Sequence, residues 1–313
     1  MALVLLQIRL TLRIILIGLY NVKYGVRSMT SPILVIGALG NVGAEVVKQI
    51  IVRGGKVRAA SIDVPRIKDR FGETVEAVRF DFTNPDTYGA TFDSVKSMFY
   101  MRPPPITHIR RDMNPSMDAA KQAGVAHTVF LSLIGIEKAK YVPHFKVEAY
   151  LKSIEMPATF LRCSFFMQNL NTTHRKEIRD RDEIFVPVGK GRTSFIDTRD
   201  IGRAAAVALM ESGHAGKNYA LTGSEGLDYW QAAAIMSEVL GRRITYRNPN
   251  PLRFLVQTLR QGTPPMFAMV MLGLYTSTRF GMAAPISNDL ERLTGRKPIT
   301  FRQYVQDYQA SWR

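Results

Sequence analysis

The sequence predicts an α/β protein in which a doubly wound parallel sheet is followed by a smaller, mostly helical C-terminal lobe. Three observations indicate this fold class. From Pro32 to Ile51, an apolar run, a glycine-rich turn and an amphipathic helix follow one another. Short apolar runs then alternate with helical segments as far as Arg162, and such alternation is typical of a parallel sheet. Beyond Cys163 the strand pattern largely gives way to helices.

The predicted elements of the first half follow in chain order. The run at 33–36 is apolar throughout and short enough for a fully buried strand, and apolar residues at helical spacing follow from Val46 to Ile51. One later helix is predicted to end at Gly124 and another to cover 144–153. Further strands are predicted at 56–62, 75–82, 97–101, 127–134 and 158–162.

The second half is predicted to add one strand to the sheet and several helices. The expected elements are a charged helix at 174–182, an alanine-rich helix at 201–210 and the last core strand at 217–222. The remainder is mostly helical, with a segment rich in methionine and aromatic residues at 266–275. Thr300 and Gln303 predict a capping box at the start of the closing helix.

Composition narrows the class of protein. The 313 residues are 46% hydrophobic, which is enough for one large core and a smaller lobe. The single cysteine, Cys163, excludes an internal disulfide and fits a reducing compartment, so we expect a cytoplasmic protein. The five histidines are scattered, and we predict no metal site. The net charge of +16 is spread along the chain, which favours anionic cofactors over nucleic acid.

Residues 1–28 are interpreted in two ways. The first 20 residues are rich in leucine and isoleucine, but Arg9 and Arg13 interrupt a run that a spanning helix would need to keep apolar. A secretory signal would carry its charge before the apolar run. The segment is either an arginine-rich targeting or membrane-surface segment or an extension ahead of a natural start at Met29. We favour the second, and expect membrane contact only if residues 1–28 are native.

The glycine turn is predicted to bind the phosphates of a dinucleotide. Its three glycines recur at a spacing of three between the first strand and its helix. The free N–H groups and the dipole of a helix N-terminus attract an anion, and a side chain in the turn would hold the pyrophosphate away from the backbone. This unit indicates a Rossmann fold. The predicted contacts are Gly37, Leu39, Gly40, Asn41, Val42 and Gly43.

The glycine turn assigns the first half of the chain to a nucleotide-binding domain. Residues 29–165 are predicted to form the NAD(P)-binding domain, and residues 166–313 the substrate lobe, which still supplies the last core strand. Apolar residues that follow the nucleotide domain are well placed to line a substrate cleft. The candidates are Phe165, Phe166, Met167, Asn169, Met266 and Met269.

The end of the second predicted strand bears on the choice between NAD and NADP. NAD users commonly place an acidic residue there to hold the ribose hydroxyls, and here Ile62 is followed by Asp63. Arg66 lies close enough in sequence to meet a 2′-phosphate. The local sequence therefore favours NAD(H) slightly without excluding NADP(H).

Eight segments carry a resemblance that runs from about Pro32 to the C-terminus. They are Gly37–Gly43, Met101–Pro104, Gly124–Ser132, Pro143–Glu148, Phe160–Asn169, Ile196–Ile201, Tyr219–Gly223 and Leu293–Pro298. In this order and spacing they resemble the NmrA-like, atypical short-chain dehydrogenases/reductases. The similarity is greatest to the branch of quinone reductases, triphenylmethane-dye reductases and ergot-alkaloid reductase-like proteins. One departure is Cys163, where the family usually has proline.

The resemblance implies further cofactor contacts. They are Ile62, Asp63, Arg66, Asp81, Phe82, Arg102, Pro103 and Ser132. In this family pattern Asp81 and Phe82 would flank the adenine, and Arg102 with Pro103 would replace the usual glycine-rich bend beneath the cofactor. The family also leans to NADP(H), so the expected cofactor is NAD(P)H with NADP slightly favoured.

The catalytic pair of ordinary short-chain dehydrogenases is missing from the sequence. None of the twelve tyrosines has lysine four residues later, and the resemblance places His144 and Glu148 where that Tyr-x-x-x-Lys pair would lie. A histidine can donate a proton near neutral pH. Alternatively, an electron-poor acceptor takes hydride first and water supplies any proton, with His144 serving only to cap its helix.

Two functions of different classes follow from these observations. The first is an NAD(P)H-dependent oxidoreductase that transfers hydride to a small electron-poor acceptor such as a quinone, dye or imine. The second is a non-catalytic dinucleotide sensor that binds a protein partner, as the resemblance to NmrA implies. We favour the reductase because of the apolar C-terminal half, and expect a monomer or homodimer.

Overall fold

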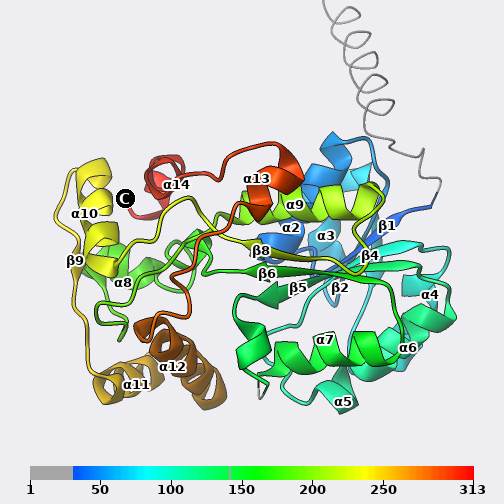
Figure 1. The fold of residues 1–313 in the computed structure, drawn as a ribbon, viewed down its shortest axis with the longest axis horizontal. Coiled ribbons are helices and arrows are strands. Elements are labelled where there is room, and N and C mark those ends of the chain that lie inside the picture. The colour runs from blue at the N-terminus through cyan, green and yellow to red at the C-terminus, as the bar shows by residue number, and fades with distance from the viewer. Residues whose placement is uncertain (1–30, 141) are drawn as a thin grey trace, which may run out of the picture.

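The computed structural model describes residues 31–140 and 142–313, so the predictions for residues 1–28 lie outside the described residues. Seven parallel strands form one sheet in the order β3-β2-β1-β4-β5-β6-β8 (Figure 1). Their bounds are β1 Ile33–Ile36, β2 Val57–Ser61, β3 Glu76–Arg79, β4 Ser97–Tyr100, β5 His127–Leu133, β6 Ala158–Cys163 and β8 Asn218–Leu221. The predicted doubly wound parallel sheet is confirmed.

Helices cover both faces of this sheet (Figure 1). One face carries α2 Asn41–Val52, α3 Val64–Phe71, α9 Thr198–Met210 and α13 Asp289–Thr294. The other carries α4 Tyr88–Phe92, α5 Ile109–Asp112, α6 Asn114–Gln122 and α7 Pro143–Ser153. Because side chains alternate along a strand, Ile33 and Val35 join the first core, whereas Leu34 and Ile36 join the second. This two-sided burial explains why β1 is a continuous apolar run.

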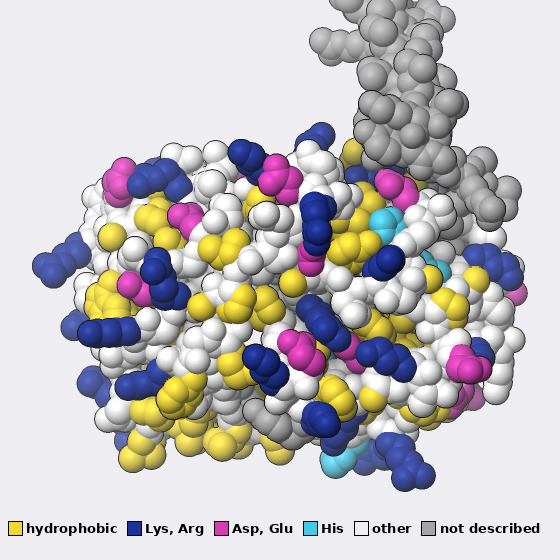
Figure 2. All heavy atoms as spheres, viewed as in Figure 1, with side chains coloured by type: hydrophobic (Ala, Val, Ile, Leu, Met, Phe, Trp, Pro, Cys, Tyr) yellow, Lys and Arg dark blue, Asp and Glu magenta, His cyan; other side chains and the backbone are white. Residues whose placement is uncertain are grey.

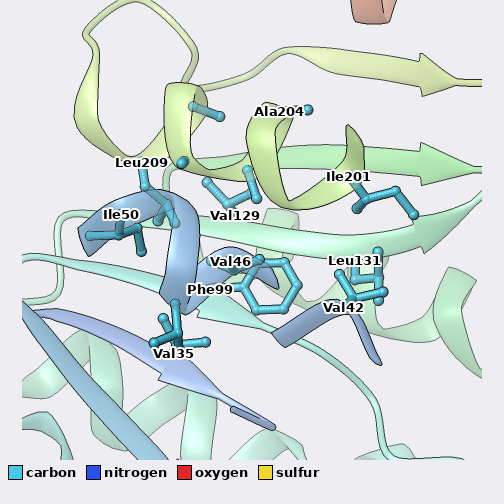
Figure 3. Close-up of a cluster of buried hydrophobic side chains, with 14 of the residues drawn as sticks. Val35, Val42, Val46, Ile50, Phe99, Val129, Leu131, Ile201, Ala204 and Leu209 are labelled. Carbon is cyan, nitrogen blue, oxygen red and sulfur yellow. The ribbon is translucent and has the colours of Figure 1, made fainter. Parts of the chain in front are cut away.

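The packing of α2 against α9 fixes the helix that follows the glycine turn. Figure 3 shows apolar side chains of α2 meeting those of the sheet and of α9. Small residues in α9 permit a close approach: a Cβ added to Gly202 would lie 2.7 Å from the carbonyl carbon of Glu45. The N-terminus of α2 is therefore held by the core, not by the turn alone.

The C-terminal lobe has a separate apolar core. It is built from α8 Arg175–Arg181, α10 Tyr229–Leu240, α11 Pro251–Arg260, α12 Pro265–Arg279 and α14 Phe301–Tyr308. A two-stranded parallel sheet, β7 Glu183–Ile184 with β9 Thr245–Tyr246, lies in the same lobe. The sequence predicted the helical character of this region but not the small sheet. Among the described residues, no helix combines the length and apolar character needed to cross a membrane.

Two local predictions need correction. The third strand ends at Arg79 and not at Phe82, because the Asp81 carboxylate accepts both the N–H and the hydroxyl of Thr83 at 2.8 Å and turns the chain. At the closing helix, Thr300 does accept the N–H of Gln303. The Gln303 side chain, however, donates to Asp307 at 2.7 Å instead of returning to the cap. A complete capping box occurs at α10, where Asp228 is the N-cap.

Candidate functional site

The glycine turn between β1 and α2 has a different role for each glycine. Gly37 adopts a φ of +76°, and a Cβ there would overlap the Met101 sulfur. A Cβ on Gly43 would overlap the Gly37 carbonyl oxygen. Gly40 is exposed, and a Cβ there would meet only that same oxygen, at 3.3 Å. Gly37 and Gly43 are thus required to fold the turn, whereas Gly40 keeps its outer side open.

The first turn of α2 presents free backbone donors beside Gly40. Gly40 is the N-cap residue and supplies no side-chain cap, and the first turn holds no acidic residue. The N–H groups of Asn41, Val42 and Gly43 precede the first intrahelical bond, which runs from Ala44 to the Gly40 carbonyl. Together with the helix dipole, these donors fit a phosphate or another anion.

The turn lies where the order of the sheet reverses. β1 pairs with β2 on one side and with β4 on the other, and ligands of open α/β sheets bind at the carboxyl end of such a switch point. Because all seven strands are parallel, residues that follow their carboxyl ends share one edge. Predicted site residues at this edge include Gly37 after β1, Ile62 after β2, Arg102 after β4, Ser132 in β5 and Phe165 after β6.

The segment after β2 offers two arginines. The Asp63 carboxylate accepts the backbone N–H of Arg66 at 3.1 Å and so caps α3, while Ile62 is 64% exposed. Arg66 is exposed. Arg70, one helical turn later, donates from Nη1 to the Leu39 carbonyl at 2.9 Å and therefore touches the glycine turn. Arg70 was not among the predicted site residues, although its i+4 spacing from Arg66 places both on one helix face.

The predicted adenine contacts Asp81 and Phe82 lie in different surroundings. Asp81 is engaged with Thr83 in the turn after β3. The Phe82 ring is buried, with its centroid 4.7 Å from that of Phe80 and 5.6 Å from that of Tyr100. Its backbone carbonyl accepts the Tyr88 hydroxyl at 2.6 Å. The Phe82 ring is therefore part of the core below α4 and does not lie open at the surface.

Arg102 follows β4 in the proline-rich loop, and His144 at the start of α7 is near enough to feel its charge. Arg102 Nη1 donates to the carbonyls of Pro103, Pro104 and Ile106 at 2.7–3.0 Å, which braces this loop. Burial lowers the pKa of Arg102 to about 10. Burial, followed by the nearby Arg102 charge, lowers the pKa of His144 to about 3. His144 is therefore neutral at physiological pH.

Two buried nitrogens at this place lack partners within the described residues. They are Nδ1 of His144 and Nε of Arg102. Buried polar atoms are rarely left without a hydrogen bond. Their positions beside the predicted bend beneath the cofactor make them candidates for contact with a bound polar group.

Glu148 is engaged with residues other than His144. Its side chain accepts the Ser132 hydroxyl at 2.6 Å and lies 2.8 Å from Arg162 Nη2. Glu148 is 3% exposed and Ser132 is fully buried. The structure thus joins Glu148 to β5 and β6, and among the described residues no hydrogen bond links it to His144. Arg162, which compensates this buried charge, was missed because only the folded sheet brings it beside α7.

The acceptor candidates separate into two groups. Phe165 and Phe166 are partly exposed after β6, close to partly exposed Asn169, whereas Met167 is only 1% exposed and belongs to the lobe core. Met266 and Met269 of α12 are 64% and 53% exposed on its outer side. The positions of these two methionines therefore do not support their predicted role in a cleft, because the inward face of α12 is formed by other residues.

Tyr275 is the inward residue of α12 that reaches the sheet edge. Its ring stacks on Phe165 with centroids 5.6 Å apart. Burial raises the pKa of Tyr275 well above its usual value, so the phenol keeps its proton. Its hydroxyl is hydrogen-bonded to Nε2 of His174, whose Nδ1 is hydrogen-bonded to Glu177. This buried chain ties α12 to α8. His174 and Tyr275 are 101 residues apart, and no sequence pattern links them.

The described residues contain no group of three or more His, Cys, Asp or Glu side chains placed to hold a metal ion. The candidate site is formed by the glycine turn, Arg66 and Arg70 after β2, Arg102 with His144 nearby, and an aromatic wall made of Phe165 and Tyr275. Its chemistry is that of holding an anionic, nucleotide-like group beside an apolar surface.

Comparisons with known proteins agree with this geometry. A model described as the NmrA-like family matches residues 29–295. Prestalk A differentiation protein A of Dictyostelium discoideum is 26% identical over 285 residues, covering 90% of this chain and 94% of that protein. The NAD(P)H azoreductase of Xenophilus azovorans is 28% identical over 296 residues, covering 90% and 99%. The structure of Citrobacter sp. triphenylmethane reductase complexed with NADP(H) has a TM-score of 0.78 at 22% identity, covering 88% of this chain and 99% of that one.

Proposed function

Because the chain belongs to the NmrA-like family, we propose that it is an NAD(P)H-dependent reductase that transfers hydride to a small, electron-poor organic acceptor. The observation that carries this proposal is the open glycine turn before the uncapped first turn of α2, at the switch point of the sheet. The names of the azoreductase and the triphenylmethane reductase support the same chemistry.

The glycine turn and the first turn of α2 fit the pyrophosphate of a dinucleotide. A Cβ at Gly40 would occupy the outer side of the turn where a pyrophosphate must approach the backbone, and the N–H groups of Asn41, Val42 and Gly43 would hold its oxygens. When bound, the dihydronicotinamide supplies the hydride. The residues at the carboxyl ends of the strands would hold that ring, and the loop that Arg102 braces would support the site.

We favour NADP(H) over NAD(H). Asp63, the acidic residue that favoured NAD(H), already accepts the N–H that begins α3. Arg66 and Arg70 add two positive charges on one face of α3, and Arg70 reaches the glycine turn through Leu39. Arginine pairs well with phosphate oxygens, so this surface suits a 2′-phosphate.

Proton transfer by a side chain is not required in this mechanism. His144 is neutral at physiological pH because its pKa is about 3, so it is a poor general acid there. The only partners of Glu148 within the described residues are Ser132, Arg162 and, more distantly, Lys152. An electron-poor quinone, dye or iminium acceptor takes hydride directly, and water then supplies any proton.

The acceptor would lie against the aromatic wall. Phe165 follows β6 at the carboxyl edge and presents a partly exposed ring that is backed by Tyr275. A flat apolar wall suits a planar conjugated acceptor, because aromatic rings prefer offset-stacked or edge-to-face contacts. Acceptor shape, more than hydrogen bonding, would then determine selectivity.

A dinucleotide sensor that binds a protein partner is the second candidate. The low pKa of His144 favours it, because a neutral imidazole is a poor acid at neutral pH. The side chain of Glu148 is already bonded to Ser132 and Arg162. In such a protein the cofactor would bind with similar affinity but without turnover. A protein partner, not a small acceptor, would then respond to the bound dinucleotide.

The two functions are separated by combining binding with turnover. We would measure NADPH and NADH binding by calorimetry, and their oxidation against a panel of quinones, triphenylmethane dyes and imines. The reductase should bind NADPH more tightly than NADH and oxidise it with at least one acceptor. Phe165→Ala should raise KM for that acceptor while leaving NADPH affinity unchanged, because its ring forms the proposed acceptor wall with Tyr275 and the proposed phosphate donors lie in α2.

Other outcomes are equally informative. Tight dinucleotide binding with no turnover across the panel would contradict the reductase and favour the sensor. Absence of dinucleotide binding would contradict both functions. Tighter binding of NADH than of NADPH would contradict the cofactor preference alone.

A further inference from the structure

The outer face of the α11–α12 hairpin exposes apolar side chains. Leu252, Val256 and Leu259 lie at helical spacing on α11 and are 70%, 40% and 38% exposed. Met266 and Met269 on α12 are 64% and 53% exposed. We call these five residues the hairpin face. Figure 2 shows hydrophobic side chains gathered along the lower left margin, over the position of α11 and α12 in Figure 1. A contiguous exposed apolar patch usually marks a binding surface.

The surrounding sequence has an unusual charge. Residues 239–288 contain six arginines and no lysine, aspartate or glutamate. Arg242 and Arg247 of this stretch pair with Asp182 and Glu183. Arg253 and Arg260 are exposed on α11 beside the hairpin face, and no ion pair connects either to another described residue. The apolar face is thus bordered by uncompensated positive charge.

These features favour one kind of partner. A second copy of the chain is disfavoured because apposed hairpin faces would bring arginines of like charge together. Protein interfaces usually rely on aromatic anchors that fill pockets, whereas the hairpin face consists of aliphatic and methionine side chains. Apolar residues beside arginines on an amphipathic helix are typical of segments that lie in the interface of an anionic membrane.

We propose that the hairpin face binds the surface of an anionic lipid bilayer. α11 and α12 would lie in the plane of the interface, with Leu252, Met266 and their neighbours entering the acyl boundary. Arg253 and Arg260 would pair with lipid phosphates. This attachment is peripheral, involves no spanning helix, and is independent of the proposed reductase activity. It also differs from the sequence prediction, which placed any membrane contact in residues 1–28.

Vesicle co-sedimentation with the full chain tests this directly. The protein should bind vesicles made of equal parts phosphatidylcholine and phosphatidylglycerol, bind pure phosphatidylcholine vesicles much more weakly, and lose binding as salt rises. Leu252→Glu and Met266→Glu should each weaken partition into the mixed vesicles about tenfold, because each replaces inserted apolar surface with a charge that anionic lipid repels. The double variant Arg253→Gln/Arg260→Gln should bind the mixed vesicles with a weaker dependence on salt concentration.

Val52→Glu is the matched control. Val52 is 66% exposed, close to the 70% of Leu252, but lies at the end of α2. Val52→Glu should bind vesicles as strongly as the unchanged chain. All variants should keep the same melting temperature, because each substituted residue is on the surface. Binding of Leu252→Glu and Met266→Glu equal to that of Val52→Glu would overturn the proposal and place the contact elsewhere, residues 1–28 included. No vesicle binding, equal binding to phosphatidylcholine alone, or a dimer that Leu252→Glu dissociates would also overturn it.

Discussion

The sheet edge that carries the glycine turn, where we propose that the cofactor binds and which we call the cofactor edge, differs from the C-terminal lobe in what stabilises its shape. At the cofactor edge, the turn from Gly37 to Gly43 is shaped by backbone contacts between neighbouring residues. In the lobe, the wall behind Phe165 depends on Tyr275 and His174, which are 101 residues apart and meet through single side-chain bonds. A site formed by neighbouring backbone residues can be predicted from the sequence. A site formed by side chains that are distant in sequence can be recognised only in the folded structure.

If the cofactor edge is a backbone site, one glycine should control it. Gly40→Val should lower dinucleotide affinity at least about 100-fold, or about 2.7 kcal/mol, because the new side chain would occupy the approach to the α2 N–H groups. The protein should still fold, since the nearest atom to a Cβ there is the Gly37 oxygen at 3.3 Å. Calorimetry with NADPH measures the loss, and circular dichroism checks the fold.

Two other glycine variants show whether position or bulk is responsible. Gly273→Val in α12 should keep its NADPH affinity, because nothing lies within 4 Å of a Cβ there. Gly43→Val should fail to fold normally, because its Cβ would overlap the Gly37 carbonyl. Retention of NADPH affinity within about threefold by Gly40→Val, or about 0.65 kcal/mol, would place the phosphate site elsewhere.

The strand, turn and helix at this edge were predicted well because each part has a local signal. The run at Ile33–Ile36 is apolar at every position since both faces of β1 are covered, and the glycine spacing follows directly. The end of β3 was misplaced because Val75 to Phe82 continues an apolar pattern through the turn that Asp81 makes. A turn stabilised by one carboxylate interrupts a strand without changing its hydrophobic pattern.

If the lobe is held by side chains, breaking one bond chain should weaken it without disturbing the cofactor edge. His174→Phe removes the imidazole between Tyr275 and Glu177, leaving a buried hydroxyl and a buried carboxylate with fewer partners. We expect a loss of about 2 kcal/mol in the free energy of unfolding, measured by urea denaturation. NADPH affinity should remain unchanged, because the glycine turn has no part in this chain.

His214→Phe is the matched control. His214 also bonds a tyrosine, Tyr219, at 2.8 Å, but it is less buried and lies beside β8. His214→Phe should lower the free energy of unfolding by less than about 1 kcal/mol. Equal destabilisation by the two variants would mean that the His174 chain has no special role in the lobe.

The lobe was poorly predicted for physical reasons. In the apolar segment from Met266 to Tyr275, the sequence does not reveal which face of the helix is inward. Met266 and Met269 were predicted to line a cleft, and the structure shows both side chains exposed. Ser132, Glu148 and Arg162 come from β5, α7 and β6. Only the register of the sheet and the position of α7 bring these three together.

The smallest effect is expected at His144, at the start of α7. If hydride transfer is the whole chemical step, His144→Phe should lower kcat less than about tenfold, or 1.4 kcal/mol. The rate should show no controlling ionisation between about pH 5 and 8, because a histidine with a pKa of about 3 does not titrate there. Loss of a general acid would instead cost about 10²–10⁴-fold and remove an ionisation from the pH–rate profile.

The low pKa of His144 should also affect how the free energy of unfolding depends on pH. Its pKa falls from 6.5 to about 3 on folding, so below pH 6.5 the unfolded chain takes up the proton first and acid favours unfolding. His144 therefore contributes stability that is present at neutral pH and is lost as pH falls from 6.5 towards 3. His144→Phe should lose less stability over that interval than the unchanged chain, measured by urea denaturation at several pH values. Parallel pH curves for the two proteins, together with a hundredfold loss of kcat at unchanged NADPH affinity, would show that His144 titrates normally and donates the proton.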